Sequence, residues 1–428
     1  MTVIDAPSEP LRTVILGQGY VGLPLAIRAA QVGHQVVGFD TDADRVKRLQ
    51  AAESSSPDVP AELIATALAN GLYAPTTRPE DLAGFDVAVI AVPTPLHDGA
   101  PDLSAIEHAG LALAPHLQPG CVIILESTTY PGTTDDLLKP LLEAASGLRA
   151  GEDFHLGYSP ERIDPGNRIW TLQNTPKIVS GVDDASLKAV SDFYRSLVDT
   201  VVEVAAVRDA ELAKLLENTF RQVNIALVNE IAVHAQQLGT DIWAALNAAS
   251  TKPFGFMHFT PGPGVGGHCL PVDPTYLSWQ VRRQTGRALR LIEAADEVNS
   301  AMPAYIVKRL ADALNRKGLP VNGSHILLLG MAYKPNTGDI RNSPTITIAR
   351  LLAGHGAHVE IVDPHADDPV GLDVRVHYSQ ITANNAATSD AVVLLTDHDA
   401  FDLQLIEDHA PYVLDCRARL SGANVERL

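Results

Sequence analysis

The fold is decided by residues 12–40, which read RTVILGQGYVGLPLAIRAAQVGHQVVGFD. A β-branched run leads into three glycines spaced as GxGxxG, an apolar segment with helical periodicity follows, and a second β-branched run ends at Asp40. This order of strand, glycine turn, helix, strand and acid is typical of a dinucleotide-binding unit, although GxGxxG outside such a context is a weak signal. The stretch therefore predicts a Rossmann-like domain at the beginning of the chain.

The three glycines have different physical tasks in that interpretation. Gly17 makes the tight turn, Gly19 allows the backbone to approach a pyrophosphate, and Gly22 allows helix and strand to pack closely. The N–H groups at the helix N-terminus stabilise the phosphate charge. Asp40 is placed to accept hydrogen bonds from ribose hydroxyls, and its charge would repel a 2′-phosphate, so NAD is favoured over NADP. The alternative is that the glycines only shape a turn.

Polar residues follow two further strand-like runs, 87–92 and 122–125. Thr94 follows the first run, and Ser127 and Thr128 follow the second. Because loops at the carboxyl ends of strands line the ligand crevice of a doubly wound sheet, all three are candidate site residues. Thr94 is almost as well explained as a helix N-cap, which does not exclude ligand contact.

Residues 159–167, SPERIDPGN, form a stiff turn bracketed by prolines. Glu161 and Arg162 in this turn are either site residues or a surface salt-bridge pair, and the sequence leaves both interpretations open. The runs 177–181 and 200–203 are predicted to be the last strands of the first domain.

Between residues 209 and 239 the apolar pattern changes to that of a long helix. Its predicted apolar side consists of Leu212, Leu215, Leu216, Val223, Leu227, Val228 and Ile231. Lys214 and Asn218 are four residues apart and share one face. Asparagine weakens a helix unless its amide is used, so this face is a candidate site, with a solvated face as the alternative. A second helix is predicted over 291–313, and this helical region is expected to supply a subunit interface.

A second α/β unit follows the turn at 321–323. Its predicted strands are 326–329, 358–362, 391–395 and 412–414, with a helix over 343–353. It lacks GxGxxG, so it must hold a ligand by other means, and Lys334 and Arg341 are available cations.

The predicted fold class is therefore α/β, with two Rossmann-like doubly wound domains joined by a central helical domain that contains a long helix. The predicted domains are an NAD-binding domain over 1–205, a central helical domain over 206–315 and a second Rossmann-like domain over 316–428.

Residues 254–274, FGFMHFTPGPGVGGHCLPVDP, contain five glycines and four prolines and predict a shaped loop whose amides are free to meet a ligand. Cys269 is displayed on this loop, four residues ahead of Asp273. A dinucleotide site combined with an exposed thiol admits two schemes. Either hydride transfer interconverts an alcohol and a carbonyl and the cysteine is incidental, or the cysteine attacks an aldehyde and a thioester is later hydrolysed. Lys214, Asn218 and Asp273 match in kind the donors and the base that the second scheme needs.

Bulk properties exclude several classes of protein. The chain of 428 residues is long enough for two or three domains, and its net charge of −19 argues against a general nucleic-acid binder. Three cysteines without metal-ligand spacing suit a reducing cytoplasm, and no metal site is expected. No signal peptide and no membrane span are expected, because residues 1–12 lack an apolar core and no apolar run is long enough.

Six separate pieces, in order, resemble the UDP-glucose/GDP-mannose dehydrogenase family over essentially the whole chain. They are 17–24 (GQGYVGLP), 126–128 (EST), 159–161 (SPE), Lys214 with Asn218, 266–269 (GGHC) with Asp273, and 334–341. The resemblance implies oxidation of a sugar C6 alcohol to a carboxylate with reduction of two NAD per UDP-sugar.

The resemblance also implies roles for particular residues. Cys269 would be the thioester nucleophile, with Lys214 and Asn218 stabilising the oxyanion. Asp273 and Thr128 would position or activate water, and Glu161 would assist hydrolysis. Residues implied at the cofactor are Gly17, Gly19, Tyr20, Val21, Gly22, Asp40, Arg45, Thr94, Ser127 and Arg341. Residues implied at the UDP-sugar are Glu161, Arg162, Lys214, Asn218, Gly264, Gly266, Gly267, His268 and Lys334.

The pieces SPERxDPGN and GPGVGGHC look like those of the UDP-N-acetylglucosamine 6-dehydrogenase branch, so UDP-N-acetyl-D-glucosamine is the expected substrate. Val272 stands where UDP-glucose members usually carry a lysine, which puts any role of that lysine in doubt. Alternatives are UDP-N-acetylmannosamine, UDP-N-acetylgalactosamine or UDP-glucose as substrate, a two-electron dehydrogenase, and a non-catalytic nucleotide-sugar-binding protein. A cytoplasmic homodimer or higher homo-oligomer is expected, with no nucleic-acid or membrane partner.

Overall fold

The computed structural model describes residues 10–54, 56, 58–97, 99–164, 166–167, 169–366, 375–377 and 381–428. The chain divides into two compact units, residues 1–217 and 218–428. Helix α7 (Val207–Ala235) begins in the first unit and continues in the second. In the described part of the chain no helix is long and apolar enough to cross a membrane.

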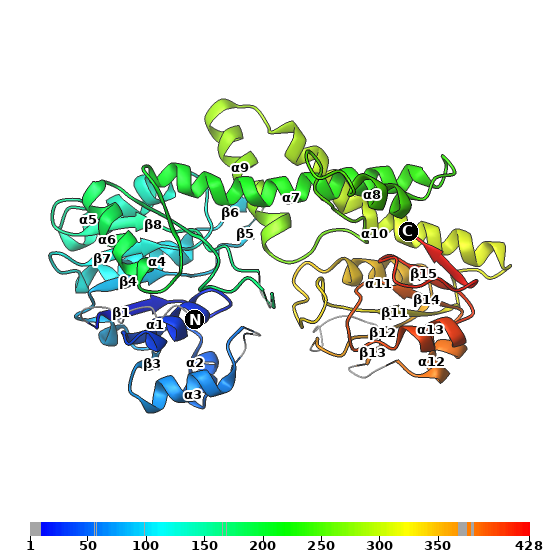
Figure 1. Ribbon diagram of the computed structural model, residues 1–428, viewed down its shortest axis with the longest axis horizontal. Coiled ribbons are helices and arrows are strands. Elements are labelled where there is room, and N and C mark those ends of the chain that lie inside the picture. Colours follow the sequence, from blue (N-terminus) through cyan, green and yellow to red (C-terminus); the bar gives the residue numbers. More distant parts are fainter. Residues whose placement is uncertain are drawn as a thin grey trace. The chain divides into compact units, whose positions relative to one another are not determined.

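The first unit is built on an eight-stranded sheet with the order β10-β9-β8-β7-β4-β1-β2-β3 (Figure 1). Its strands are β1 (Arg12–Leu16), β2 (Gln35–Phe39), β3 (Tyr73–Thr76), β4 (Val87–Ile90), β7 (Val122–Leu125), β8 (His155–Tyr158), β9 (Lys177–Gly181) and β10 (Val201–Val204). All neighbours are parallel except β8 and β9. The strand order reverses between β1 and β4, which is the switch point where such sheets bind ligands. A short hairpin, β5 (Leu96–His97) and β6 (Ala100–Pro101), follows β4.

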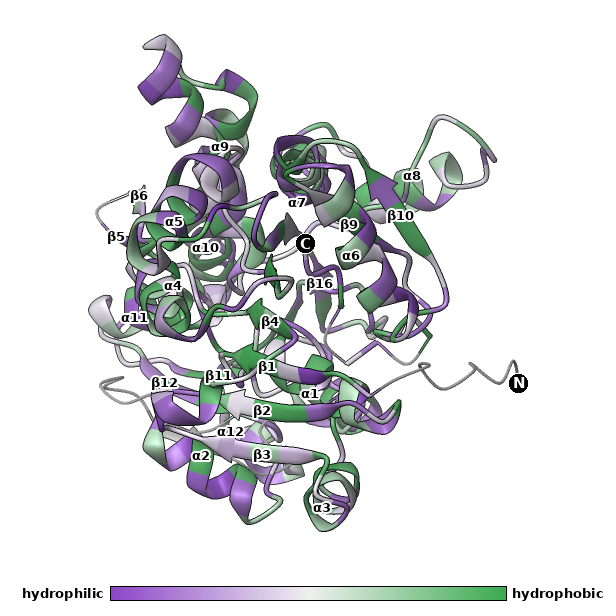
Figure 2. Cartoon of the chain, turned by 90° about the vertical axis from the view of Figure 1, so that its left-hand side faces the viewer, coloured by the Kyte–Doolittle hydropathy of each residue, from purple (hydrophilic) through white to green (hydrophobic). Residues whose placement is uncertain are grey.

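Alternation along the buried strands creates one core on each face of this sheet. Val14 and Leu16 of β1 belong to a core that α4 (Ser104–Leu113) and α5 (Lys139–Ser146) cover. Ile15 belongs to the opposite core, which α1 (Gly22–Gln31), α3 (Ala61–Ala69) and α6 (Asp184–Arg195) cover. The remaining helical segments are α2 (Ala43–Gln50), η1 (Pro79–Leu82), η2 (Ala114–His116) and η3 (Thr134–Leu138). Figure 2 shows β4 as hydrophobic and α2, on the surface, as largely hydrophilic.

The second unit contains a six-stranded parallel sheet with the order β13-β12-β11-β14-β15-β16 (Figure 1). Its strands are β11 (His325–Leu329), β12 (His358–Val362), β13 (Arg375–His377), β14 (Ala391–Leu394), β15 (Val413–Asp415) and β16 (Val425–Arg427). Helices α10 (Arg290–Arg316) and α11 (Pro344–Gly354) cover one face. Helices α12 (Ala383–Thr388) and α13 (Leu403–His409) cover the other. Helices α8 (Ile242–Ala249) and α9 (Cys269–Thr285) precede α10.

The predicted fold class is confirmed, because two Rossmann-like sheets and a long central helix are all present. The bounds of the three predicted domains stay a prediction. The loop predicted over 254–274 is wrong at its end, where α9 begins at Cys269 and contains Pro274. Pro271 breaks no intrahelical hydrogen bond, because the first four N–H groups of a helix have no partner inside it, and only Pro274 removes one.

The predicted apolar side of α7 is in fact divided between two faces. Leu215 and Val228 are buried. Five apolar side chains of α7 are exposed and recur every four or seven residues: Leu212, Leu216, Phe220, Leu227 and Ile231. Spacings of four and seven place them along one line, so α7 presents an apolar stripe that the described part of this chain leaves exposed.

Candidate active site

The glycine turn predicted to bind a cofactor lies at the carboxyl end of β1. Gly17 has φ +91° and donates its N–H to the Phe39 carbonyl at 2.8 Å. A Cβ at Gly22 would meet the Gly17 carbonyl oxygen and would lie 3.3 Å from Ile15 Cγ2. A Cβ at Gly19 would meet nothing within 4 Å. The close helix–strand packing expected at Gly22 and the open approach expected at Gly19 are therefore both seen in the geometry.

Asp40 holds this turn together from the end of β2. Its Oδ2 accepts from the Gln18 N–H at 2.8 Å and from Arg45 Nη1 at 2.9 Å, and its Oδ1 accepts from the Asp42 N–H at 2.9 Å. Asp42 in turn caps α2, which carries Arg45. Tyr20 and Val21 complete the turn ahead of α1, with Tyr20 exposed. The glycine turn and Asp40 thus lie at the carboxyl ends of the neighbouring strands β1 and β2, as in a dinucleotide-binding fingerprint.

The hydroxyls predicted at the ends of β4 and β7 join the two loops. Thr94 Oγ1 donates to the Thr128 carbonyl at 2.8 Å, and Ser127 Oγ donates to the Val92 carbonyl at 2.8 Å. Thr94 and Ser127 are buried, and Thr128 is half-buried. Thr94 caps no helix in this structure, so the N-cap explanation is wrong for it.

A cluster of buried charges lies next to these loops, at the ends of β7 and β8 and the start of β9. Lys177 Nζ donates to Glu126 Oε1, and it lies 3.2 Å from Glu161 Oε2. Glu161 Oε1 accepts from the N–H groups of Arg162 at 2.6 Å and Ile163 at 2.5 Å. The sequence pointed to Glu161 alone; Glu126 and Lys177 were missed, because a lysine that opens a β-branched run carries no signal of its partner.

The alternative of a surface salt bridge between Glu161 and Arg162 is wrong. Arg162 instead pairs with Glu217 of α7 at 2.7 Å and donates to the Pro176 carbonyl at 2.7 Å. Glu161 is 7% exposed and faces Lys177, so it belongs to the interior rather than to the surface.

Different environments shift the pKa values of the two carboxylates in this cluster in opposite directions. Burial raises the pKa of Glu126, and the attraction of Lys177 offsets this only in part. Burial also acts to raise the pKa of Glu161, but Lys177, its hydrogen bonds and Lys214 outweigh that effect and hold this pKa below its ordinary value. Lys177 keeps its charge, because the two carboxylates raise its pKa against the effect of burial. Lys214 is itself buried, with 7% of its surface exposed.

In the second unit, α9 carries the thiol. Cys269 is its first residue and is exposed, whereas Cys121 and Cys416 are buried. Burial raises the pKa of Cys121, and it raises that of Cys416 to about 12, so neither forms a thiolate readily. A helix N-terminus stabilises a thiolate at its first turn. Cys269 is thus the cysteine suited to nucleophilic chemistry.

Asp273 lies one helical turn after Cys269 and contacts α7. Its Oδ2 accepts from Asn218 Nδ2 at 2.5 Å, and Asn218 Oδ1 accepts from Arg221 Nη2. Asp273 and Asn218 are 0% and 1% exposed. The structure therefore brings three predicted residues, Cys269, Asp273 and Asn218, to one place, and Lys214 is one turn before Asn218 on the same helix. Arg221 was missed by the sequence interpretation.

The glycine-rich segment ahead of Cys269 packs on the loop after β11. The Gly267 N–H donates to the Arg341 carbonyl at 2.7 Å, and the Gly267 carbonyl accepts from Asn342 Nδ2 at 2.9 Å. Gly267 has φ +80°, and a Cβ there would lie 2.7 Å from the Tyr333 ring. The amide of Gly267 is therefore occupied within the chain rather than free for a ligand. This packing places Gly264, Gly266 and His268 on a segment next to the one that carries Lys334.

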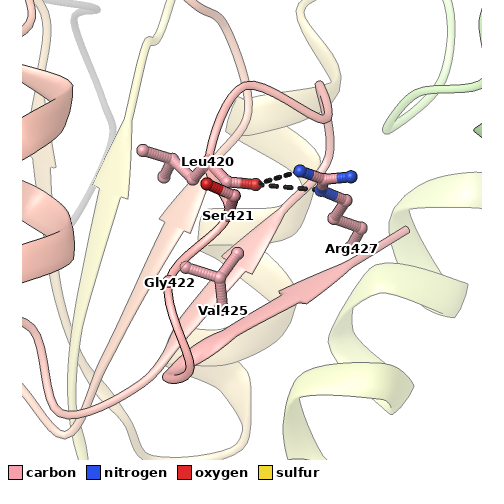
Figure 3. Close-up of a pocket in the computed structure, with 5 residues that line it drawn as sticks. All are labelled: Leu420, Ser421, Gly422, Val425 and Arg427. Carbon is pink, nitrogen blue, oxygen red and sulfur yellow. Dashed lines mark hydrogen bonds between the residues drawn. The ribbon is translucent and has the colours of Figure 1, made fainter.

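A surface hollow of about 440 Å³ lies elsewhere in the second unit, around β16 (Figure 3). It is lined by Leu420, Ser421, Gly422, Val425 and Arg427. The Arg427 guanidinium donates to the Leu420 carbonyl at 2.9 and 2.7 Å, so its charge is engaged within the chain. None of the predicted site residues lines this hollow.

Comparison with known proteins adds an independent finding. Models of the UDP-glucose/GDP-mannose dehydrogenase family match residues 11–198 (NAD binding domain), 208–301 (central domain) and 327–422 (UDP binding domain). A UDP-N-acetyl-D-mannosamine dehydrogenase of Pyrococcus horikoshii is 37% identical over 91% of this chain and 90% of its own. A UDP-N-acetyl-D-glucosamine 6-dehydrogenase of Pseudomonas aeruginosa is 36% identical over 92% of each chain. A solved UDP-D-ManNAc dehydrogenase structure from Pyrococcus horikoshii has a TM-score of 0.88 and 34% identity, covering 97% of this chain and 98% of that one.

Substitution of two motif glycines separates packing from cofactor binding. Gly22→Ala is expected to lower the free energy of unfolding by about 1–3 kcal/mol, because its methyl group meets the Gly17 carbonyl. Gly19→Ala is expected to change that free energy by less than about 0.5 kcal/mol, because its surroundings are open. It should nevertheless weaken NAD binding, because the added methyl group obstructs the pyrophosphate. Denaturant titration and NAD titration measure the two effects, and wild-type NAD affinity in Gly19→Ala would refute the role given to this glycine.

Proposed function

Because the chain belongs to the UDP-glucose/GDP-mannose dehydrogenase family and is an NAD-dependent UDP-sugar dehydrogenase, we propose that it oxidises the C6 hydroxyl of UDP-N-acetyl-D-glucosamine to a carboxylate in two steps. The observation that carries this proposal is the exposed Cys269 at the N-terminus of α9, one turn before an aspartate that is hydrogen-bonded to Asn218. A dehydrogenase that stopped at the aldehyde would have no use for this thiol.

In the proposed mechanism, Cys269 acts between the two oxidations. Its thiolate adds to the C6 aldehyde, and oxidation of the resulting thiohemiacetal leaves a thioester on the sulfur. Lys214 and the Asn218 amide donate to the C6 oxygen, which carries negative charge when the carbon is tetrahedral. The Asn218 amide is oriented for this role, because Arg221 binds its oxygen and Asp273 binds its nitrogen.

Hydrolysis of the thioester then needs water and a base. Asp273 and Thr128 are proposed to position the water, and the ionised Glu161 is proposed to accept its proton as the water oxygen bonds to C6. The C–S bond breaks, the sulfur leaves as the thiolate, and Cys269 is ready for another substrate molecule. Glu161 suits this role because its pKa is held low, so it is unprotonated at neutral pH.

The cofactor is proposed to lie on the turn after β1. Gly17, Gly19, Tyr20, Val21 and Gly22 form that turn, and the N–H groups at the start of α1 suit a pyrophosphate. Asp40 and Arg45 lie at its ribose end, and Thr94, Ser127 and Arg341 are further proposed contacts. Bound NAD would accept a hydride from C6 in each oxidation.

The substrate's nucleotide is proposed to bind in the C-terminal part of the chain, where the UDP binding domain model matches. Lys334 follows β11 and would compensate phosphate charge. Residues 264–268 are proposed to contact the sugar. Arg162 and His268 are proposed to contact the acetamido group, and Arg162 is held in a fixed position by Glu217 and the Pro176 carbonyl.

The proposed acetamido substrate is supported by similar proteins whose names specify N-acetylated sugars, one N-acetylmannosamine and one N-acetylglucosamine. Among these, UDP-N-acetyl-D-glucosamine is proposed from the sequence pieces at 159–167 and 262–269, and UDP-N-acetyl-D-mannosamine is the second candidate because of the Pyrococcus relative.

Replacement of Cys269 tests the thioester route. Cys269→Ser is expected to reduce acid formation by on the order of a thousandfold or more, because a serine hydroxyl is a far weaker nucleophile and leaving group. The wild-type protein should yield two NADH per sugar acid. Product analysis and NADH absorbance measure both quantities, and Cys121→Ala, at a buried thiol, is the matched control that should retain activity. Full acid formation by Cys269→Ser would contradict the mechanism.

A substrate panel tests the sugar assignment. UDP-N-acetylglucosamine is expected to give the highest kcat/KM, above the N-acetylmannosamine and N-acetylgalactosamine nucleotides, and UDP-glucose is expected to be at least about tenfold poorer, because it leaves the acetamido contacts unpaired. NADH formation with each nucleotide is the measurement. A preference for UDP-N-acetylmannosamine would establish the second candidate, and a preference for UDP-glucose would overturn the acetamido assignment.

The homo-oligomer predicted from the sequence is now proposed to form through α7. Its five exposed apolar side chains form a continuous stripe, whereas apolar residues on a free surface are usually scattered singly. The same stripe on a second copy of this chain would cover it. In a two-fold dimer the same stripe from each copy forms the interface, so α7 of one copy would pack against α7 of the other.

Charged substitutions on the stripe test this interface. The double variant Leu216→Glu and Leu227→Glu is expected to convert an oligomer into monomers, because both side chains are more than half exposed in the single chain and their charges would be buried against the stripe of the other copy. Light scattering after gel filtration measures the mass. Leu111→Glu, on α4 and 50% exposed, is the control that should leave the mass unchanged. An unchanged mass for the double variant would exclude this face.

A further inference from the structure

We propose that Lys177 is a positioning residue for Glu161, which keeps the Glu161 carboxylate ionised and fixed for hydrolysis of the thioester, and that Glu126 holds the Lys177 ammonium in place. This inference rests on the role proposed for Glu161 above and assigns work to two residues that have none in that mechanism. Both act through Glu161 rather than on the substrate.

The side chains around Lys177 form a buried cluster of paired charges. Lys177 is 2% exposed and Glu126 is 1% exposed. The Lys177 ammonium donates to Glu126 Oε1 and lies 3.2 Å from Glu161 Oε2. On the other side of Glu126, the Tyr194 hydroxyl of α6 lies 3.3 Å from Oε2, and the Tyr194 ring centroid lies 5.1 Å from Lys177 Nζ.

Glu161 is held from two directions. The N–H groups of residues 162 and 163 bind its Oε1, and Lys177 binds its Oε2, so the plane of the carboxylate is fixed. The charged or titratable groups that act on this cluster are Glu126 from the end of β7, Lys177 from β9, Tyr194 from α6 and Lys214 from α7. A carboxylate oriented in this way needs little reorganisation when it accepts a proton.

The charges of the three side chains explain which of the two carboxylates takes up a proton. A lone buried ammonium or carboxylate is costly, and one ammonium between two carboxylates leaves one negative charge in excess. Burial raises the pKa of Glu126, whereas Lys177 and Lys214 hold that of Glu161 low. Two carboxylates whose pKa values are pushed apart divide the acid and base states between them. Glu126 therefore takes up a proton first, and Glu161 stays available as the base.

The pH dependence of acid formation tests the proposal. A base must be unprotonated, so activity is present above the pKa of Glu161 and is lost as the pH falls through it. Lys177→Met removes the cation that lowers this pKa, so the acid limb of kcat is expected to move to higher pH by about one unit or more. Lys177→Arg keeps the charge and should restore the wild-type limb. Glu126→Gln leaves the cation to Glu161 alone and should not move the limb to higher pH.

A second variant covers the risk that Lys177→Met does not fold, since it leaves Glu126 without its cation and Glu161 with Lys214 alone. The double variant Lys177→Met and Glu126→Gln removes one carboxylate as well, and it should show the same shift to higher pH. Thermal unfolding confirms that each variant is folded. The NADH that forms in the first turnover, before the thioester is hydrolysed, should still be produced.

Glu161→Gln separates failure of this inference from failure of the proposed function. If Glu161→Gln forms acid at the wild-type rate, the role of Glu161 is wrong and the inference falls with it. If Glu161→Gln slows acid formation but the lysine variants keep the wild-type limb, or lose activity equally at every pH, only the inference is overturned. A shift in Lys177→Met that Lys177→Arg reverses supports it.

Discussion

Buried carboxylates at the ends of strands organise the loops of this protein. A buried carboxylate without donors is costly, so the loop that supplies the donors is held in one conformation. Asp40 after β2 binds the N–H of Gln18, and Asp363 after β12 binds those of Met331 and Ala332. In both units, therefore, the turn after the first strand of the sheet is fixed by an acid from the neighbouring strand.

The two acids nevertheless differ in what remains for a ligand. Asp40 lies beside Arg45, which is partly exposed, whereas Asp363 is fully buried and also binds His398 at 3.0 Å. His398 and the loop N–H groups lower the pKa of Asp363 to about 2, although burial acts in the opposite direction. The second acid is thus committed to fixing its loop, and contact with a cofactor is proposed only for the first. This difference agrees with an NAD binding domain at one end of the chain and a UDP binding domain at the other.

Glu126 departs from this arrangement because its principal donor is a side-chain ammonium. A main-chain N–H cannot titrate, but a lysine shared by two carboxylates couples their protons. The same physical constraint that elsewhere only fixes a loop here also sets the charge of Glu161, the carboxylate proposed as the base. Helix α7 shows a related division, since its buried side carries Glu211, Lys214 and Asn218 while the apolar stripe described above is exposed. A catalytic role is proposed for the interior side of the helix and association is proposed for the exterior side.

Sequence by itself determined what local pattern encodes. The glycine spacing at 17–22, the run of β-branched strands and the helical period after residue 209 specified two Rossmann-like units and a long helix, and the comparisons agree with the family that the motifs resemble. The sequence also pointed to Cys269 as a candidate nucleophile. It did not predict that Cys269 begins a helix, because prolines in the first turn of a helix resemble those of a loop. Only the tertiary structure decided which polar groups share a buried site. Lys177 and Glu126 are 51 residues apart, and burial, which turns their attraction into control of a pKa, exists only once the sheet has formed.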